Sequence, residues 1–115
     1  MLSKASEMKK ETREKMRDGK GAIELAHVFT QEQMKNEARL CARLTLNPGC
    51  SIGYHEHVND EEIYYIISGT GTVTDNGEKY TVSSGDAILT GHGEWHSIEN
   101  TGDKPLEMLA IVMLF

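Results

Sequence analysis

Short runs of alternating apolar and polar residues, separated by glycine-rich turns, recur along most of this 115-residue sequence. The clearest run covers residues 39–46, where every second side chain is apolar, namely Leu40, Ala42, Leu44 and Leu46. Further strands are expected at residues 22–29, 62–67, 78–82, 87–90, 96–100 and 105–115, and Asn76-Gly77 marks a hairpin. Such spacing predicts one small all-β barrel or two-sheet roll without tandem repeats.

The first twenty residues differ from the rest of the chain in charge. They hold seven basic and four acidic side chains, a balance of +3, whereas residues 21–115 hold five and fourteen, a balance of −9. With too few apolar positions for a buried helical stripe, they are expected to form an arm or short surface helix, residues 1–20, before a barrel domain, residues 21–115. A solvated tail is the usual form of such a charge run, but Arg17 or Lys20 could fold over the barrel mouth.

Composition narrows the classes of partner. A strongly acidic barrel repels phosphate backbones, so no nucleic-acid partner is expected. No apolar run reaches membrane-spanning length and the charged opening lacks a signal-like apolar core, which predicts a cytoplasmic protein without membrane contact. Cys41 and Cys50 have no CxxC spacing and are interpreted as incidental reduced thiols.

Two segments carry a candidate metal site. His55 and His57 lie two residues apart, so on a strand their imidazoles point to the same side. The run 62–67 is expected to return antiparallel and to bring Glu62 beside them, and His96 supplies a third imidazole after a glycine-rich turn. Burying such a set without an ion would leave costly unpaired groups. We therefore expect a divalent transition metal (manganese, iron, cobalt, nickel, copper or zinc), with positions left open for a further ligand.

The two segments resemble the paired motifs of the cupins. The first family pattern is matched at every position by Gly49, His55, His57, Glu62 and Gly69. The second is matched by Gly85, Gly93, His96 and Asn100, while Gly91 stands where the family has proline. The resemblance implies a double-stranded β-helix, or jelly-roll, fold. Similar small single-domain cupins, some labelled oxalate-decarboxylase-like or sugar-phosphate-isomerase-like, also form homodimers.

Residues around the motifs leave alternatives open. Glu61 is the rival of Glu62, but only Glu62 leaves the family spacing before Gly69. By strand parity the pocket wall is expected to include Tyr64, Ile66 and Ile98, although core packing explains these residues equally well. Outside the motifs, His27 and His92 are interpreted as structural, and Trp95 as a rim or interface aromatic.

Two classes of function follow from this site. The first is a metalloenzyme acting on a small oxygen-rich metabolite (a carboxylate, enolate or sugar) as a dioxygenase, decarboxylase or isomerase. The second is a non-catalytic metal-dependent binding or sensing module. The shortage of basic residues in the barrel disfavours a sugar-phosphate substrate, and it also disfavours oxalate unless the arm contributes Arg17.

The last run of the chain predicts self-association. Residues 106–114 are apolar on both faces after Glu107, so if one face fills the barrel the other is exposed. The outward set would comprise Leu109, Ile111, Met113 and Phe115, together with Ile63, Tyr65 and Ile67. Because a small monomer poorly tolerates such a patch in water, a homodimer packed through sheet faces is expected.

Overall fold

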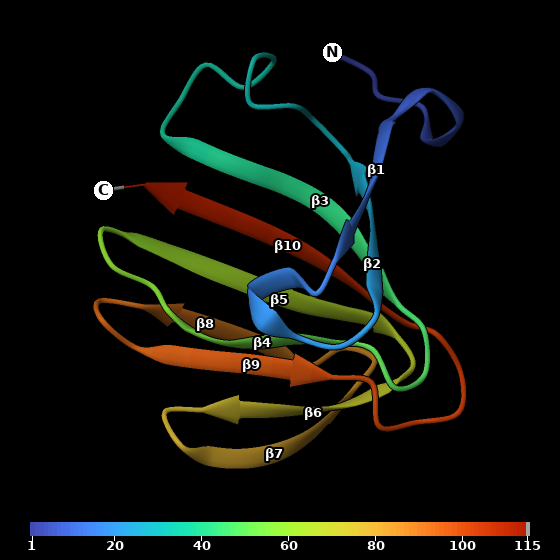
Figure 1. Cartoon of the computed structure of the whole chain (residues 1–115). Coiled ribbons are helices and arrows are strands. Elements are labelled where there is room, and N and C mark those ends of the chain that lie inside the picture. Colours follow the sequence, from blue (N-terminus) through green and yellow to red (C-terminus); the bar gives the residue numbers. More distant parts are fainter. Residues whose placement is uncertain (115) are drawn as a thin grey trace.

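In the computed structural model, residues 1–114 form two antiparallel sheets that face each other (Figure 1). The six-stranded sheet has the order β1-β2-β3-β10-β5-β8, and its strands are β1 (Lys9–Glu14), β2 (Ala22–His27), β3 (Ala38–Leu46), β10 (Leu106–Leu114), β5 (Asp60–Ser68) and β8 (Ala87–Gly91). The four-stranded sheet has the order β4-β9-β6-β7, with β4 (Ser51–Glu56), β9 (Trp95–Glu99), β6 (Thr70–Asp75) and β7 (Glu78–Ser83). Two 3-10 turns, η1 (Ala5–Glu7) and η2 (Met16–Asp18), flank β1. The predicted all-β jelly roll is confirmed.

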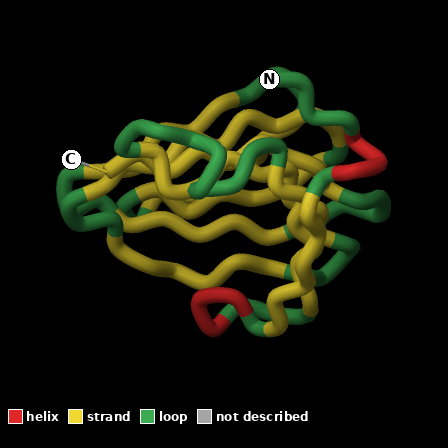
Figure 2. The backbone as a smooth tube through the Cα atoms, turned by 90° about the horizontal axis from the view of Figure 1, so that it is seen from above, coloured by secondary structure: helices red, strands yellow, loops and turns green. Residues whose placement is uncertain are grey.

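The core lies between the two sheets and follows the predicted alternation. On β10 the side chains of Leu106, Met108, Ala110 and Val112 are buried, while the intervening residues are half-buried on the outer face. The other sheet contributes Ile52, Val73, Val82 and Ile98. Viewed from above, the strands run through the body of the molecule and most loops lie at their ends (Figure 2). Phe115, predicted to face outward, lies outside the described residues. Within residues 1–114 no helix is long and apolar enough to cross a membrane.

The two ligand-bearing strands of the first motif do not form a hairpin, contrary to the expectation from sequence. Strand β4 pairs with β9, whereas β5 pairs with β10 and β8 in the opposite sheet. The chain leaves β4 after Glu56, and Asn59 takes a left-handed conformation with φ of 61° before β5 begins. Glu62 therefore meets the histidines across the interior between the sheets and not along one sheet.

The beginning of the chain forms part of the sheet and not a surface helix. Residues 9–14 are the edge strand β1, which pairs antiparallel with β2. By this register Lys9, Glu11 and Arg13 stand opposite His27, Leu25 and Ile23, on the inner face. That face borders a polar cavity instead of the apolar core. Its alternation therefore carries no apolar signal, which is why the strand was missed. The division into arm and barrel domain stays a prediction.

The turn η2 is fixed against β4 by backbone contacts. Arg17 has φ of 53°, and both Lys15 and Asp18 are also left-handed, a conformation that costs about 1 kcal/mol or more per residue. The glycines at 19 and 53 allow the two backbones to meet, since a Cβ at Gly53 would collide with the carbonyl oxygen of Arg17. In Figure 1 this blue turn lies over the strands of the barrel.

Asn100 ties together the turn that precedes β10. Its buried amide nitrogen donates to the carbonyl oxygens of Leu46 at 2.8 Å and Lys104 at 2.7 Å. Its side-chain oxygen accepts from the backbone N–H of Gly102 at 2.9 Å. The asparagine of the second motif therefore has a structural role, because its side chain satisfies three backbone groups around this turn.

We expect Asn100→Ala to lower the free energy of unfolding by about 2 to 3 kcal/mol, because the buried Leu46 carbonyl loses its partner. Urea denaturation measures this loss. The control is Thr101→Ala, which removes an exposed hydroxyl and should cost at most about 0.5 kcal/mol. Equal stability of the two variants would contradict the role given to Asn100.

Candidate metal centre

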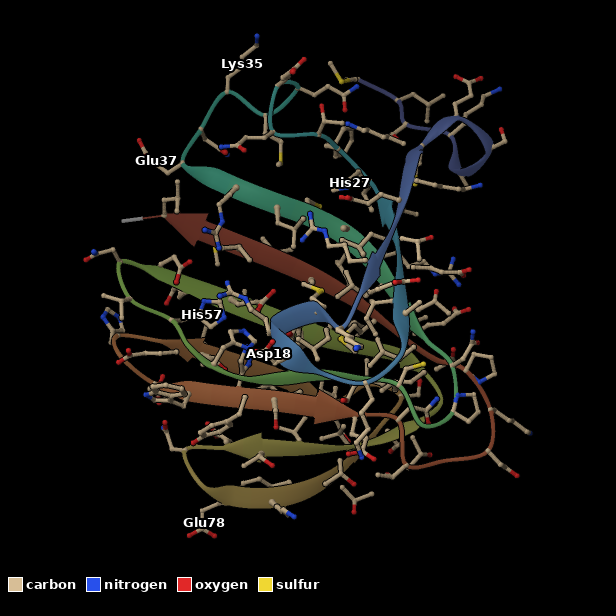
Figure 3. The ribbon with its side chains drawn as sticks, in the orientation of Figure 1. Asp18, His27, Lys35, Glu37, His57 and Glu78 are labelled. Carbon is tan, nitrogen blue, oxygen red and sulfur yellow. The ribbon has the colours of Figure 1, made fainter. Side chains whose placement is uncertain are left out.

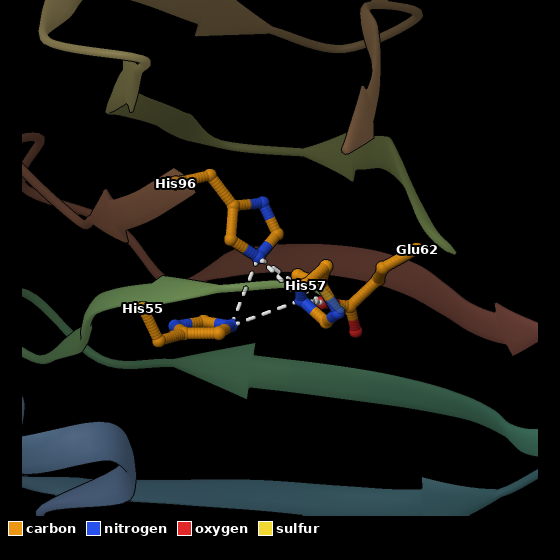
Figure 4. A group of neighbouring side chains, drawn as sticks. All are labelled: His55, His57, Glu62 and His96. Atoms are coloured by element: carbon orange, nitrogen blue, oxygen red, sulfur yellow. Dashed lines mark hydrogen bonds and ion pairs between the residues drawn. The ribbon is translucent and has the colours of Figure 1, made fainter. Parts of the chain in front are cut away.

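Four side chains from both sheets meet in the interior (Figure 4). His55 and His96 stand opposite each other on β4 and β9, His57 follows β4, and Glu62 comes from β5. The three Nε2 atoms lie 3.0 to 3.1 Å from one another. Glu62 Oε1 lies 3.1 Å from His57 Nε2 and 3.2 Å from His96 Nε2. All four residues are buried, so the structure brings together the set predicted from sequence.

Hydrogen bonds on the far side of two rings fix their tautomers. His55 Nδ1 lies 2.6 Å from the carbonyl oxygen of Gly53, and His57 Nδ1 lies 2.8 Å from Asp60 Oδ1. Because both partners can only accept, each Nδ1 carries the proton and donates it. When these rings are neutral, their Nε2 lone pairs therefore point at one another. Such an arrangement requires a cation between the nitrogens or a proton on one of them.

The neighbours of these ligands hold them in place. Asp60 bridges His57 to Arg39, whose Nη2 donates to Asp60 Oδ2 at 2.9 Å. Thr90 Oγ1 lies 2.9 Å from His96 Nδ1. The fully buried ring of Tyr64 stacks on the His96 ring, with centroids 4.8 Å apart and planes 10° from parallel. Since each imidazole has a partner behind it, its Nε2 stays directed at the common point.

Burial and mutual contacts shift the pKa values within the cluster. Burial lowers the pKa of His55 to about 4, with smaller contributions from its neighbours, among them the positive charge of Arg17. Burial alone would raise the pKa of Glu62, but hydrogen bonds from His57 and His96 outweigh it and lower the pKa to about 2. For His57, burial is outweighed by its bonds to Glu62 and Asp60, which raise its pKa. Without a metal, a proton is therefore held more readily by His57 than by His55.

The cluster could hold a transition-metal ion. Neighbouring ligands around one six-coordinate ion lie about 3.0 Å apart when each bond is about 2.1 Å long, and the five shortest separations here are 3.0 to 3.2 Å. Three neutral imidazoles and one carboxylate form a borderline-to-hard donor set. The spacing and the chemistry of the residues thus fit the predicted ion, while its identity stays open.

A cavity of about 730 Å³ leads to this cluster. His55, His57, Glu62 and Tyr64 line its inner part. Four basic residues also line it, namely Lys9, Arg13, Arg17 and Arg39. Three of them come from the first twenty residues. The shortage of basic groups inferred from the barrel sequence therefore does not describe the cavity, because β1 and η2 supply the positive charge.

The remaining predicted residues are found in different places. Of the three expected pocket residues, Tyr64 lines the cavity, whereas Ile66 and Ile98 are fully buried in the core and do not line it. His27 was interpreted as structural but borders the cavity, where its Nε2 lies 2.7 Å from Glu11 Oε1. Its only sequence signal was inward parity on β2. Trp95 stacks on Tyr54 at the surface, with ring centroids 5.3 Å apart.

The shifted pKa of His55 predicts a pH dependence for the metal-free protein. Its pKa is about 4 when folded and 6.5 when unfolded, so the unfolded chain binds the proton more readily. The contribution to stability is complete above pH 6.5 and is lost as the pH falls toward 4. We expect metal-free wild type to lose about 2 to 3 kcal/mol over this range that His55→Gln does not lose. Chemical denaturation at pH 7, 5.5 and 4.5 measures the difference, and parallel curves would contradict it.

Comparison with known proteins identifies relatives with the same architecture. A family model described as the cupin domain matches residues 42–112. An oxalate-binding protein of Thermotoga maritima is 47% identical over 114 residues, which cover 99% of this chain and 94% of that protein. The crystal structure of a predicted oxalate decarboxylase from Thermotoga maritima has a TM-score of 0.95 and 47% identity, with 100% of both chains covered. A polyketide cyclase from Streptomyces resistomycificus, 17% identical over 98% of this chain and 78% of that chain, has a TM-score of 0.79 and shares the fold alone.

Proposed function

The chain belongs to the cupin family, and on that premise we propose that His55, His57, Glu62 and His96 bind a divalent transition metal that in turn holds a small carboxylate. The observation that carries the proposal is the position of the cluster. It lies at the inner end of a cavity whose other charged lining is largely basic. An anion that enters this cavity meets cations along the wall and can reach the ligand atoms.

Oxalate is the first ligand to test. The 47% identical relative is named an oxalate-binding protein, and oxalate is small, oxygen-rich and doubly negative. A bound metal would supply Lewis acidity and accept carboxylate oxygens. The protein residues would do the rest: Asp60 and Thr90 hold the imidazoles, and Tyr64 donates its hydroxyl proton to Glu62. Burial and the Glu62 charge raise the Tyr64 pKa well above its ordinary value, so this hydroxyl stays a donor.

The proposal has a catalytic and a non-catalytic form. In the first, the carboxylate is decarboxylated or oxidised; in the second, the chain binds or senses it without turnover. Glu62 is turned toward the imidazoles, and Glu11 in the cavity is engaged by Arg13 and His27. These two carboxylates are therefore not free to accept a substrate proton, which leaves Glu32 as the other carboxylate of the cavity lining. Binding of the carboxylate is common to both forms.

Loss of one imidazole should remove the metal. We expect His96→Gln to retain less than about a tenth of the wild-type metal, because outer contacts alone already change metal affinity 10- to 100-fold and a direct ligand matters more. The control is His92→Gln, four residues away in the turn before β9 and outside the cluster. Elemental analysis after dialysis gives the content, and a full complement in His96→Gln would contradict the assignment.

Calorimetry on the metal-loaded protein should detect oxalate binding, and metal-free protein should show none. Formate, carbon dioxide and dioxygen are then followed in the same samples. Turnover identifies the enzyme, whereas binding without turnover identifies the module. A loaded protein that binds neither oxalate nor other small carboxylates would contradict the proposal. Sugar phosphates belong in the panel, since the four basic residues of the cavity could also bind a phosphate.

We also propose that the protein forms a homodimer through the outer face of the six-stranded sheet. Ile111 of β10, Ile63 of β5 and Leu89 of β8 are cross-strand neighbours and form an apolar row on this face. Leu89 is 57% exposed, and Tyr65 and Ile67 beside the row are also exposed. A second copy would cover this stripe by symmetric face-to-face packing.

A charge placed in the middle of this row should separate the copies. We expect wild type to elute as a dimer and Ile63→Lys as a monomer, because a lysine would be buried unpaired at the contact. Light scattering coupled to gel filtration measures the mass. Tyr80→Lys changes an exposed aromatic on the other sheet and should leave the dimer intact. Monomeric wild type would exclude the interface.

A further inference from the structure

We propose that Arg17 determines which ligands the metal centre accepts, because its guanidinium receives the carboxylate oxygens that the metal leaves free. The site then selects small dicarboxylates over monocarboxylates. This inference rests on the proposed metal-dependent carboxylate binding. It assigns recognition of the ligand's second carboxylate to Arg17, a residue of the turn η2 that lies outside both cupin motifs.

The backbone of Arg17 has a fixed position next to the cluster. Met16 packs against the core, and its carbonyl oxygen accepts the Gly19 N–H at 2.9 Å. At the other end of the turn, the Lys20 carbonyl accepts from the Ser51 N–H at 2.8 Å, while the Lys20 N–H donates to Ser51 Oγ at 2.9 Å.

This anchored turn meets the strand that carries a metal ligand. The Arg17 carbonyl lies against Gly53, two residues before His55 on β4. The side chain lines the same cavity as His55, His57 and Glu62. Figure 3 labels Asp18 and His57, and it shows the turn in front of the strands that carry the site.

Arg17 also has its charge available. Within residues 1–114 it takes part in no ion pair and no side-chain hydrogen bond. Two other arginines of the cavity are engaged, Arg13 by Glu11 at 2.9 Å and Arg39 by Asp60 at 2.9 Å. Three residues of this turn have positive φ, and the turn carries a guanidinium without a partner. Backbone strain of this kind is often found at ligand sites, and a bound anion would pair with the Arg17 charge.

Lys9 is the matched comparison, since it lines the cavity and likewise has no ion pair within the described residues. It lies on the edge strand β1, which the sheet order separates from β5 by β2, β3 and β10. Neighbouring strands are about 4.8 Å apart, so the path along the sheet from Lys9 to Glu62 crosses four such steps. General attraction of anions would involve both residues, whereas contact with a ligand on the metal would involve Arg17 alone.

The chemistry of a guanidinium specifies the ligand class. Its planar fork donates two parallel hydrogen bonds to one carboxylate, which an ammonium group cannot reproduce. A monocarboxylate whose oxygens are taken by the metal has nothing left for this fork. A dicarboxylate as short as oxalate or malonate presents further oxygens to it. Selectivity therefore depends on the second carboxylate.

The test measures binding of oxalate, malonate, formate and inorganic phosphate to metal-loaded wild type, Arg17→Gln, Arg17→Lys and Lys9→Gln. Metal content and melting temperature are determined for each. We expect Arg17→Gln to weaken oxalate binding roughly 10- to 100-fold, the usual effect of losing a charge-assisted contact. Formate binding should change less than about twofold, and metal content should not change. Arg17→Lys should recover part of the loss, and Lys9→Gln should lose less than about threefold.

The possible outcomes distinguish the role of Arg17 from the proposed function. Equal oxalate affinity in wild type and Arg17→Gln, or an equal loss in Lys9→Gln, would overturn the role of Arg17 and leave the proposed function standing. Tighter binding of phosphate than of oxalate to wild type would overturn the ligand class. Wild type that binds metal but no carboxylate would refute the proposed function itself. Because glutamine at position 17 keeps the left-handed backbone demand unchanged, a folding defect is not expected, and the melting temperature verifies this.

Discussion

Everything else in this structure depends on three imidazole nitrogens that lie 3.0 to 3.1 Å apart inside a protein. Nitrogen lone pairs at this distance repel unless a positive charge stands between them or on one of them. The Gly53 carbonyl and the Asp60 carboxylate increase this repulsion. They accept the Nδ1 protons of His55 and His57, so each neutral ring carries its lone pair on Nε2. The fold is therefore committed to a cation here, a proton on His57 or a metal ion shared by four ligands.

The two-sheet architecture makes this convergence possible. Three ligands come from the four-stranded sheet and its adjoining loop, and the fourth comes from the six-stranded sheet. The ligands thus bridge the two sheets from inside, beside a core of aliphatic side chains. The cavity opens between the sheets, where β1 and η2 add charged groups to its wall. The two cupin motifs supply the four candidate metal ligands, and the first twenty residues supply three of the four basic side chains of the cavity wall.

The ligands were predictable because spacing on a strand fixes the side on which a residue points. Three inward histidines and a glutamate would also be costly to bury without an ion between them. The pairing of β4 and β5 was not predictable, since a three-residue link is compatible with a hairpin and with a crossing between sheets. Strand β1 was missed for a different reason. Lys9, Glu11 and Arg13 alternate toward a wet cavity, so the apolar pattern that reveals most strands is absent. Ile66 and Ile98 have the parity of pocket residues, but parity cannot tell the core from the cavity along one face.

Strand β1 lies at one edge of the six-stranded sheet, where its outer backbone groups have no neighbouring strand within residues 1–114. Its exposed backbone groups are flanked by Lys9, Lys10 and Arg13, and charged edges resist the addition of a foreign strand. If cleavage in the loop before β2 allowed β1 to dissociate, the edge of β2 would become exposed, and this strand contains the apolar residues Ile23 and Leu25. Strand β1, which contributes Lys9, Glu11 and Arg13 to the cavity wall, thus also covers the edge of β2, along which another chain could otherwise pair.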